Sequence, residues 1–206
     1  MISFKNLQLA AILSGNKEKL RKEALLKRAK LKSLKVENIS KKITNELFKN
    51  FDFDKLNVHL FYPISKNNEV NTWHIHNKLS NSKNLYTTIF DESSKSWDCI
   101  CFEPTAKFSP GKFNIPFPSI YKIDLFKKID IILIPLVVFD KYGNRIGYGK
   151  GVYDNILKRL NTNCIKVGLS LFEVSLENIQ PESHDIALDY CQTPNKLFKF
   201  KLKDKI

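Results

Sequence analysis

The densest run of apolar residues in the chain covers positions 129–138, IDIILIPLVV. Nearly all of these residues are branched, the run is too short to cross a membrane, and turn residues bound it. The run therefore predicts a strand that is buried on both faces. Further along, Val152, Ile156, Leu157 and Leu160 recur at helical spacing and predict a helix. The segment between them holds four of the seven glycines of the chain.

On either side of this segment, the pattern of apolar and polar positions predicts alternating helices and strands. Asn16 is a candidate cap for a helix that runs through about Lys35, with Leu20, Ala24, Leu31 and Leu34 along its buried side. Further predicted elements are a helix over 37–50, strands over 56–62, 85–90, 97–102 and 164–172, and a helix after Thr72. Such alternation is typical of a three-layer α/β/α fold with a largely parallel sheet. Ligands bind these sheets at the carboxyl ends of the strands.

At 206 residues, 43% of them hydrophobic, the chain has the size and composition of a single globular domain. We expect the domain to cover 16–195, with an N-terminal extension over 1–15 and a basic tail over 196–206. No apolar run is long enough for a membrane span, and residues 1–15 make a poor secretory signal. The four cysteines lack the spacing of a zinc site, so reduced thiols are expected. We expect a cytoplasmic monomer.

The net charge of +13 suggests a nucleic-acid-binding protein until the charge is located along the chain. Residues 1–50 carry +9 and residues 196–206 carry +4, so the rest is neutral. The basic residues are 30 lysines and 4 arginines, and they are not interleaved with aromatic residues as in proteins that bind nucleic-acid bases. We expect a solvated cationic face that attracts anionic small-molecule substrates. A nucleic-acid-binding module is the alternative.

The glycine-rich loop over 143–151, GNRIGYGKG, is the segment with the most informative chemistry. Without a Cβ the backbone can adopt positive φ and approach a ligand closely. A strand, a glycine-rich turn with Lys and Arg, and a helix N-terminus together can bind phosphate. Asp154, in the first helical turn, can hold the Mg²⁺ that accompanies a nucleotide. The loop therefore predicts a nucleotide-binding site, and a tight surface turn with solvated charges is the plainer alternative.

The segment 143–154, GNRIGYGKGVYD, resembles the hallmark G-N-R-[LI]-G-x-G-x-G-x-Y-D of the 5-formyltetrahydrofolate cyclo-ligase family, the 5,10-methenyltetrahydrofolate synthetases. It matches neither the P-loop nor the dinucleotide fingerprint. The segment 17–21, KEKLR, is similar to the K-x-x-L-R with which the family contacts ATP phosphates, and ordinary surface cations are the alternative. The segment 69–72, EVNT, is similar to E-[VI]-x-T, whose glutamate binds the pterin. Glu69 suits this role because a carboxylate can accept two N–H bonds, and a helix-start carboxylate is the alternative.

Two later segments extend the resemblance to about Thr193. The segment 113–118, FNIPFP, is similar to [WFY]-x-I-x-[EQ]-P, and Phe113 can stack on a pterin. The segment 181–185, PESHD, is similar to the family's P-x-E-x-H-D, with one residue fewer between Pro and Glu, and the resemblance implies that Asp185 shares a metal site with Asp154. Two such carboxylates repel each other unless a cation or a proton lies between them. Asp185→Asn is therefore expected to stabilise the metal-free protein slightly. The chain departs from the family at Thr88-Ile89-Phe90 in place of a Pro-Arg pair, at Phe117 in place of Glu or Gln, and at Val174 in place of Gln.

The resemblance implies a ligase of folate one-carbon metabolism. Such an enzyme uses ATP, with Mg²⁺, to close 5-formyltetrahydrofolate to 5,10-methenyltetrahydrofolate, and it releases ADP and phosphate. Lys150 and Arg145 are the implied catalytic cations, and Asp154 and Asp185 are the implied metal ligands. The implied ATP-binding residues are Lys17, Arg21, Arg145, Ile146, Gly147, Tyr148, Gly149, Lys150, Gly151, Val152 and Tyr153. The implied folate-binding residues are Tyr62, Glu69, Phe113 and Tyr153. The departures leave open a family paralogue with an altered small-molecule substrate.

Overall fold

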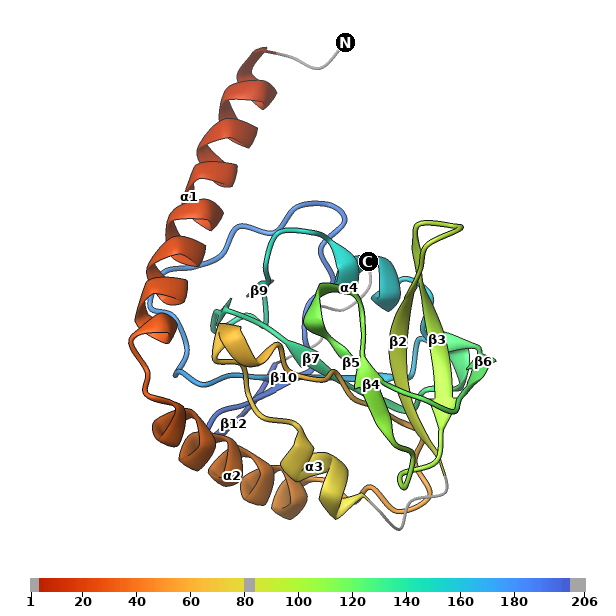
Figure 1. Ribbon diagram of the computed structural model, residues 1–206. Helices are drawn as coiled ribbons and strands as arrows, with labels where there is room; N and C mark the ends of the chain where they lie inside the picture. Colours follow the sequence, from red (N-terminus) through yellow and green to blue (C-terminus); the bar gives the residue numbers. More distant parts are fainter. Residues whose placement is uncertain (1–3, 80–83, 201–206) are drawn as a thin grey trace.

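A twisted eight-stranded sheet with the strand order β12-β11-β10-β7-β1-β2-β3-β6 forms the centre of the molecule (Figure 1). The computed structural model describes residues 4–79 and 84–200. The sheet strands are β1 (Val58–His59), β2 (Leu85–Asp91), β3 (Ser96–Phe102), β6 (Lys122–Asp124), β7 (Ile131–Pro135), β10 (Ile165–Leu169), β11 (Tyr190–Gln192) and β12 (Leu197–Lys199). Two hairpins lie outside the sheet and consist of β4 (Phe108–Pro110) with β5 (Pro116–Pro118), and β8 (Val138–Phe139) with β9 (Arg145–Ile146). The α-helices are α1 (Phe4–Ala29), α2 (Ser33–Asn50), α3 (Trp73–Lys78) and α4 (Val152–Leu157), and the 3-10 turns are Ser65–Asn67, Lys112–Asn114 and Phe126–Lys128.

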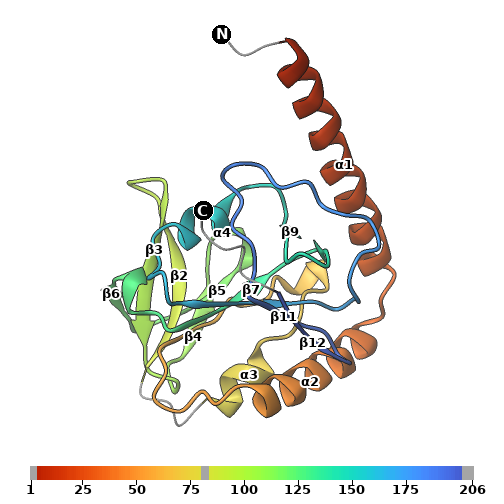
Figure 2. The ribbon, with the colours of Figure 1, turned by 180° about the vertical axis from the view of Figure 1, so that it is seen from behind.

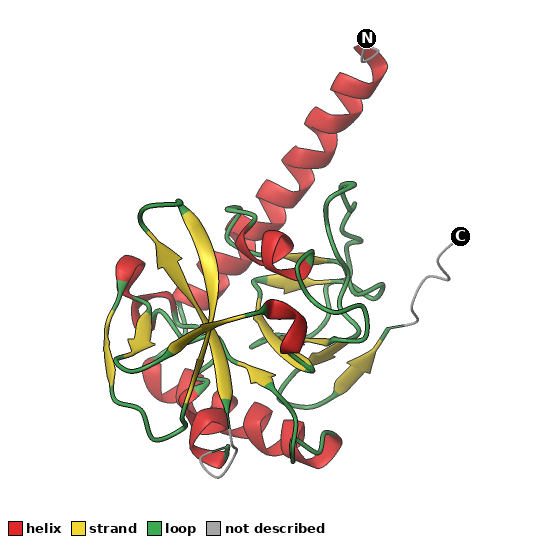
Figure 3. Ribbon diagram, turned by 90° about the vertical axis from the view of Figure 1, so that its right-hand side faces the viewer, coloured by secondary structure: helices red, strands yellow, loops and turns green. Residues whose placement is uncertain are grey.

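The strands are parallel in the middle of the sheet and antiparallel at its edges. β7 pairs in parallel with β1 and β10, which pair in parallel with β2 and β11. β12, β3 and β6 are attached by antiparallel pairings. Figure 3 shows how these strands fan across the sheet. The prediction of a single α/β domain with a largely parallel sheet is confirmed, and the predicted strand at 129–138 supplies its central strand, β7.

Two apolar cores, one on each face of the sheet, separate the layers of the fold. Successive side chains of a strand point to opposite faces. Ile131 and Leu133 of β7 therefore join the core that includes α2 and α3, whereas Ile132 and Ile134 join the core that includes Ile156 of α4. Figures 1 and 2 show α2 and α3 on one side of the sheet and α4 on the other.

The central strand ends three residues earlier than the sequence predicts. Pro135 has no N–H to donate to a neighbouring strand. The carbonyl of Leu136 then accepts a hydrogen bond from the Arg28 guanidinium at 2.5 Å. The Val137 amide donates to the carbonyl of Ile146 at 2.8 Å, so the chain turns into the β8–β9 hairpin. This hairpin, which the sequence did not predict, connects the central strand to the glycine loop.

The predicted helix at 16–35 is wrong at both ends. α1 begins at Phe4, so Asn16 lies inside the helix and does not cap it. α1 ends at Ala29, and a separate helix begins at Ser33, earlier than the predicted 37. Leu34 therefore lies in the first turn of α2, where it is 70% exposed instead of buried.

The end of α1 is capped by a side chain from a distant part of the sequence. The amide Nδ2 of Asn68 donates to the carbonyl oxygens of Arg28 and Leu31 at 3.1 and 3.0 Å. These contacts satisfy carbonyl groups that a helix end otherwise leaves unpaired. The side chain that stops α1 therefore comes from a loop 40 residues away from Arg28 in the sequence.

The ends of the predicted domain differ from the structure as well. Residues 4–15 and 16–29 form one continuous helix, whose N-terminal part projects from the body of the molecule (Figure 1). Leu197–Lys199 forms β12 beside β11, and Phe200 is buried, so the sheet continues into the predicted tail. Residues 1–3 and 201–206 of the predicted extension and tail lie outside the described residues. No described helix combines the length and the apolar character needed to cross a bilayer.

Candidate active site

A cleft with a volume of about 730 Å³ opens at the carboxyl ends of β1 and β7. Segments that are far apart in the sequence line it: α1, the loop after β1, the facing parts of β2 and β3, the segment 113–115, the end of β7, the glycine loop with the start of α4, and the segment 182–185. Every residue that the sequence predicts to bind ATP, folate or metal lines this cleft. The fold therefore brings the predicted residues together, while their individual roles stay predictions.

The glycine loop, which includes β9 and leads into α4, is held against α1. Gly149 and Gly151 have φ values of +87° and +63°, in the left-handed region that favours glycine. A Cβ at Gly149 would lie 3.3 Å from Cζ of Arg21. Nε of Arg21 donates to the carbonyl of Gly147 at 2.9 Å. Glycine at position 149 thus lets the Arg21 guanidinium lie directly against the loop.

Lys17, one helical turn before Arg21, binds two carboxylates of the segment 182–185. Its Nζ lies 2.6 Å from Oδ2 of Asp185 and 2.9 Å from Oε1 of Glu182. Burial opposes the charged amine, but the two carboxylates outweigh burial and raise the pKa of Lys17. Burial also opposes ionisation of Asp185, but hydrogen bonds from Lys17 and from the Glu182 amide lower its pKa on balance. Lys17 and Asp185 therefore form an ionised pair that ties α1 to this segment.

Arg145 and Asp154 form a second ion pair at the glycine loop. Nη2 of Arg145 lies 2.6 Å from Oδ1 of Asp154, and Nη1 donates to the carbonyl of Ile186. The Arg145 side chain is only 6% exposed. Arg145 thus links β9, α4 and the segment that follows Asp185.

The two predicted metal ligands, Asp154 and Asp185, are each paired with a different side-chain cation. Each uses one carboxylate oxygen in its ion pair, Oδ1 in Asp154 and Oδ2 in Asp185. Within residues 4–79 and 84–200, no three His, Cys, Asp or Glu side chains are grouped so as to hold a metal ion. A nucleotide-associated Mg²⁺ needs only one or two carboxylates, because phosphate oxygens and water complete its shell. The aspartates therefore fit such an ion, and do not fit a metal ion held by protein side chains alone.

Glu69 is buried, at 7% exposure, on the wall of the cleft next to β1. Its Oε2 accepts a hydrogen bond from the Ile64 amide at 2.6 Å. Burial raises the pKa of Glu69, and the Tyr148 hydroxyl, the Ile64 amide and the charge of Arg28 counteract part of that increase. Helix α3 begins only at Trp73, and the carboxylate contacts Ile64 instead of the helix start. The alternative of a helix-start carboxylate is therefore disfavoured.

Tyr62 presents its ring to the cleft, because its hydroxyl is bound by His76. The hydroxyl lies 2.8 Å from Nδ1 of His76, whose Nε2 lies 2.8 Å from the carbonyl of Pro104. A carbonyl can only accept, so Nε2 carries the proton, and burial lowers the pKa of His76 and favours the neutral ring. Nδ1 therefore accepts from the hydroxyl, and Tyr62 is suited to apolar or stacking contact with a ligand.

Phe113 lies at the mouth of the cleft and is 43% exposed. The Nζ of Lys150 lies 4.7 Å from the centre of its ring, a cation–π distance. Phe90 and Trp97 make edge and tilted contacts with the same ring at 5.7 and 6.3 Å. The aromatic residues of the β2–β3 hairpin and the lysine of the glycine loop thus meet at Phe113.

The remaining predicted residues anchor the glycine loop in the cores. Ile146 is buried against Leu20 of α1, and Val152 packs against the core on the α4 face. The ring of Tyr153 makes an edge contact with His59 at 6.3 Å, and burial raises the pKa of Tyr153. These contacts explain why a loop with four glycines holds a defined shape.

The structure adds cleft residues that the sequence did not indicate. They are Phe61, Ile64, Asn67, Thr87, Lys95, Trp97, Glu182 and His184, among others. Arg28 lies behind the cleft and contacts Tyr148. Its rarity was an available indication, because it is one of four arginines and lies two helical turns after Arg21. Of the three departures from the family, the segment 88–90 reaches the cleft through Thr88 and Phe90, whereas Phe117 and Val174 are not among the lining residues.

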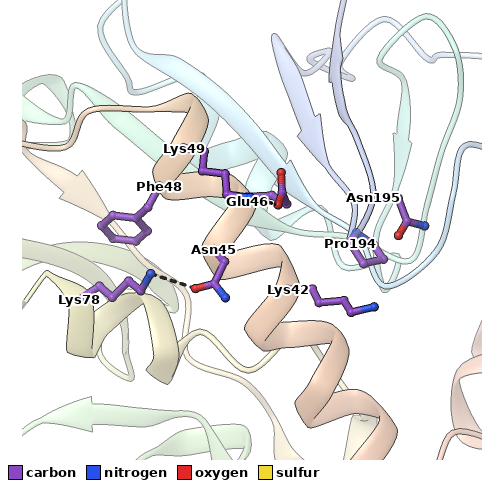
Figure 4. Close-up of a pocket in the computed structure, with 8 residues that line it drawn as sticks. All are labelled: Lys42, Asn45, Glu46, Phe48, Lys49, Lys78, Pro194 and Asn195. Atoms are coloured by element: carbon purple, nitrogen blue, oxygen red, sulfur yellow. Dashed lines mark hydrogen bonds and ion pairs between the residues drawn. The ribbon is translucent and has the colours of Figure 1, made fainter.

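A second hollow, shown in Figure 4, lies between α2, the end of α3 and residues 194–195. Its lining is Lys42, Asn45, Glu46, Phe48, Lys49, Lys78, Pro194 and Asn195. Two of its three lysines have partners: Lys78 donates to Asn45 at 3.0 Å, and Lys49 pairs with Glu46 at 2.7 Å. None of the predicted site residues lies there, so this hollow is separate from the candidate active site.

Comparison with known proteins agrees with the motifs. The profile of the 5-formyltetrahydrofolate cyclo-ligase family matches residues 13–194. The 5-formyltetrahydrofolate cyclo-ligase of Haemophilus influenzae is 32% identical over 111 residues, 52% of this chain and 59% of that protein. The structure of the 5,10-methenyltetrahydrofolate synthetase of Aquifex aeolicus has a TM-score of 0.75 and 26% identity, over 92% of this chain and 95% of that one. The chain thus spans less than two thirds of the curated relative in sequence, and nearly all of the solved structure in fold.

Proposed function

Because the chain belongs to the 5-formyltetrahydrofolate cyclo-ligase family, we propose that it converts 5-formyltetrahydrofolate to 5,10-methenyltetrahydrofolate with ATP, releasing ADP and phosphate. The observation that carries the proposal is the lining of the cleft. The glycine loop and the cations of α1 meet a buried carboxylate and aromatic rings within one cavity. A phosphate-binding surface beside a polar, aromatic surface suits a nucleotide next to a pterin.

The chemistry follows from the poor leaving ability of a formamide oxygen. The formyl oxygen attacks the γ-phosphorus, ADP departs, and the oxygen becomes part of a phosphate ester. N10 of the folate then attacks the activated carbon. Phosphate leaves with the electrons of the C–O bond, N10 loses its proton, and the methenyl bridge remains. All reacting groups belong to the substrates, so the protein contributes alignment and charge neutralisation.

Most of the predicted charged and aromatic residues would have a role in this scheme. Lys150, Lys17 and Arg21 line the cleft and would bind phosphate. Arg145, predicted as a second catalytic cation, is paired with Asp154 and would act on phosphate charge from within that pair. A Mg²⁺ ion, when bound, would add neutralisation of phosphate charge, and Asp154 and Asp185 would hold it. Glu69 would accept N–H bonds from the pterin, while Tyr62, Phe113 and Tyr153 would pack against its rings.

The test is to mix the purified protein with ATP, Mg²⁺ and 5-formyltetrahydrofolate and to follow the absorbance of the methenyl product. Appearance of the chromophore only with ATP supports the proposal. ATP binding without the chromophore would indicate a paralogue with another substrate, for which Thr88 in the cleft is the first residue to examine. Salt-sensitive binding to RNA, with neither activity, would indicate the nucleic-acid alternative.

We further propose that the enzyme acts as a monomer in the cytoplasm. All four cysteines are free, which suits a reducing compartment. Light scattering of the purified protein tests the oligomeric state, and a dimer mass would contradict it.

A further inference from the structure

Three segments of the chain meet at His76, a buried residue of α3. Its Nδ1 accepts from the hydroxyl of Tyr62, in the loop after β1, at 2.8 Å. Its Nε2 donates to the carbonyl of Pro104, just beyond the end of β3, at 2.8 Å. Tyr62 lines the cleft, whereas His76 is not among the lining residues. An influence of His76 on a ligand in the cleft must therefore pass through a neighbour, and Tyr62 is the neighbour to which it is bonded.

Aromatic side chains surround the ring of Tyr62 on the sides that face away from the cleft. The ring centres of Trp73 and Phe108 both lie 4.6 Å from that of Tyr62, and the ring centre of Phe102 lies at 6.4 Å. Tyr62 is only 2% exposed, so its hydroxyl is a polar group within an apolar core. Two phenylalanines in place of Tyr62 and His76 would fill this core and leave no polar group to satisfy. Packing alone therefore does not account for the bond between Tyr62 and His76.

The bond to His76 decides which part of Tyr62 a ligand meets. While the hydroxyl donates to His76, the ring is the part of the side chain that remains for the cleft. Without an acceptor at position 76, the buried hydroxyl would be unpaired, and an unpaired buried hydroxyl costs free energy. The cleft is the side of Tyr62 that water can reach, so the hydroxyl would turn there to be hydrated. A folate entering the cleft would then have to remove this water, and its binding would weaken.

We propose that His76 is a positioning residue for the folate: it binds the Tyr62 hydroxyl away from the cleft, so that Tyr62 meets the folate with its ring. The proposal rests on the proposed role of Tyr62 in folate binding. The Pro104 carbonyl keeps the proton of the imidazole on Nε2, so Nδ1 stays an acceptor for the hydroxyl. Burial lowers the pKa of His76 and thereby supports the neutral ring that this arrangement needs.

The experiment measures kcat and the KM values for 5-formyltetrahydrofolate and ATP in His76→Phe, in Tyr62→Phe and in the double variant. His76→Phe leaves the hydroxyl without an acceptor and is expected to raise KM for the folate about tenfold, while KM for ATP changes less than about twofold. Tyr62→Phe removes the hydroxyl itself and is expected to raise KM for the folate only about twofold. The double variant should match Tyr62→Phe, because no unpaired hydroxyl is left. The second substitution thus recovers most of what the first one loses.

His76→Asn is the conservative control. Its side-chain oxygen can replace Nδ1 as the acceptor of the Tyr62 hydroxyl. It should therefore recover most of the folate affinity that His76→Phe loses. Failure of both His76→Asn and the double variant to recover KM for the folate would overturn the proposal.

Two further results would overturn the role of His76 and leave the proposed function intact. A larger rise of KM for the folate in Tyr62→Phe than in His76→Phe would mean that the folate binds the hydroxyl. Lower thermal stability of His76→Phe with both KM values unchanged, or raised equally, would make His76 a purely structural residue. If His76→Phe does not fold, as judged by circular dichroism, Tyr62→Phe decides: a rise of KM for the folate by about threefold or less supports the proposal, and a larger rise overturns it.

Tyr62→Leu separates this proposal from its premise. It removes the ring and should raise KM for the folate more than Tyr62→Phe does. An unchanged KM for the folate in Tyr62→Leu would remove the role of Tyr62, and the His76 proposal with it, while turnover of the wild type would still support the proposed function. Absence of the methenyl product in the wild type would overturn both proposals.

Discussion

Asp185→Asn is the substitution for which the structure reverses the expectation from sequence. Two neighbouring carboxylates predict that removing one charge stabilises the metal-free protein. In the structure, Asp185 is paired with Lys17 at 2.6 Å and accepts the Glu182 amide at 2.8 Å. Asparagine can still accept the amide bond but lacks the charge that binds the lysine. We therefore expect Asp185→Asn to lower the free energy of unfolding without Mg²⁺ or nucleotide.

The magnitude follows from the exposure of the two partners. A hydrogen bond to a charged group contributes about 1.5–3 kcal/mol when buried, and an exposed ion pair about 0–1 kcal/mol. The Lys17 and Asp185 side chains are 11% and 21% exposed, which places this pair between the two cases, at about 1–2 kcal/mol. Glu182 binds the same lysine at 2.9 Å but is 45% exposed. Glu182→Gln is thus a matched control with an expected loss of at most about 0.5 kcal/mol.

Urea denaturation at several pH values measures both variants. The pKa of Asp185 is lowered in the folded protein, so its contribution is complete above the unfolded pKa of about 3.9 and is lost as pH falls through the lower folded value. The difference between wild type and Asp185→Asn should therefore hold from neutral pH to about pH 4 and shrink below it. Equal stability of wild type and Asp185→Asn at neutral pH, or equal losses in both variants, would refute the reasoning.

Four further predictions concern turnover. Lys150→Ala should lower kcat/KM for ATP by about 2–4 kcal/mol of transition-state stabilisation, and unchanged kinetics would make the loop a simple turn. Gly149→Val should be as severe in the same assay, because a β-branched residue at a φ of +87° is strained and its Cβ meets Arg21 at 3.3 Å. Glu69→Gln should raise KM for the folate by a factor of about ten or more with KM for ATP unchanged, and equal losses for both substrates would contradict the pterin assignment. If Asp154 and Asp185 share one Mg²⁺, the turnover of the double Asn variant should be little lower than that of either single variant when Mg²⁺ is titrated. Additive losses of turnover without a change in Mg²⁺ dependence would show that the two residues act separately.

Local patterns in the sequence were sufficient to predict elements whose own residues carry the signal, such as a strand buried on both faces or a glycine-rich loop. The run at 129–138 predicted a buried strand, of which the structure forms Ile131–Pro135, and the spacing of four glycines with Lys150 and Asp154 predicted the glycine loop. The two alternating segments at 85–90 and 97–102 likewise predicted strands β2 and β3, but their antiparallel pairing was not predicted. Helix ends were less predictable, because a side chain from elsewhere decides them, as Asn68 does for α1.

The pairing of charges is a property of the tertiary structure. Lys17 and Asp185 are 168 residues apart, and no local pattern indicates that each of the two aspartates has its own cation. Arg28 is one of only four arginines, but its position between Leu136 and Tyr148 is decided by the fold. Residue type and spacing determine which groups are available for chemistry. Which of these groups are buried, paired or ionised depends on distances and solvent exposure that exist only once the chain has folded.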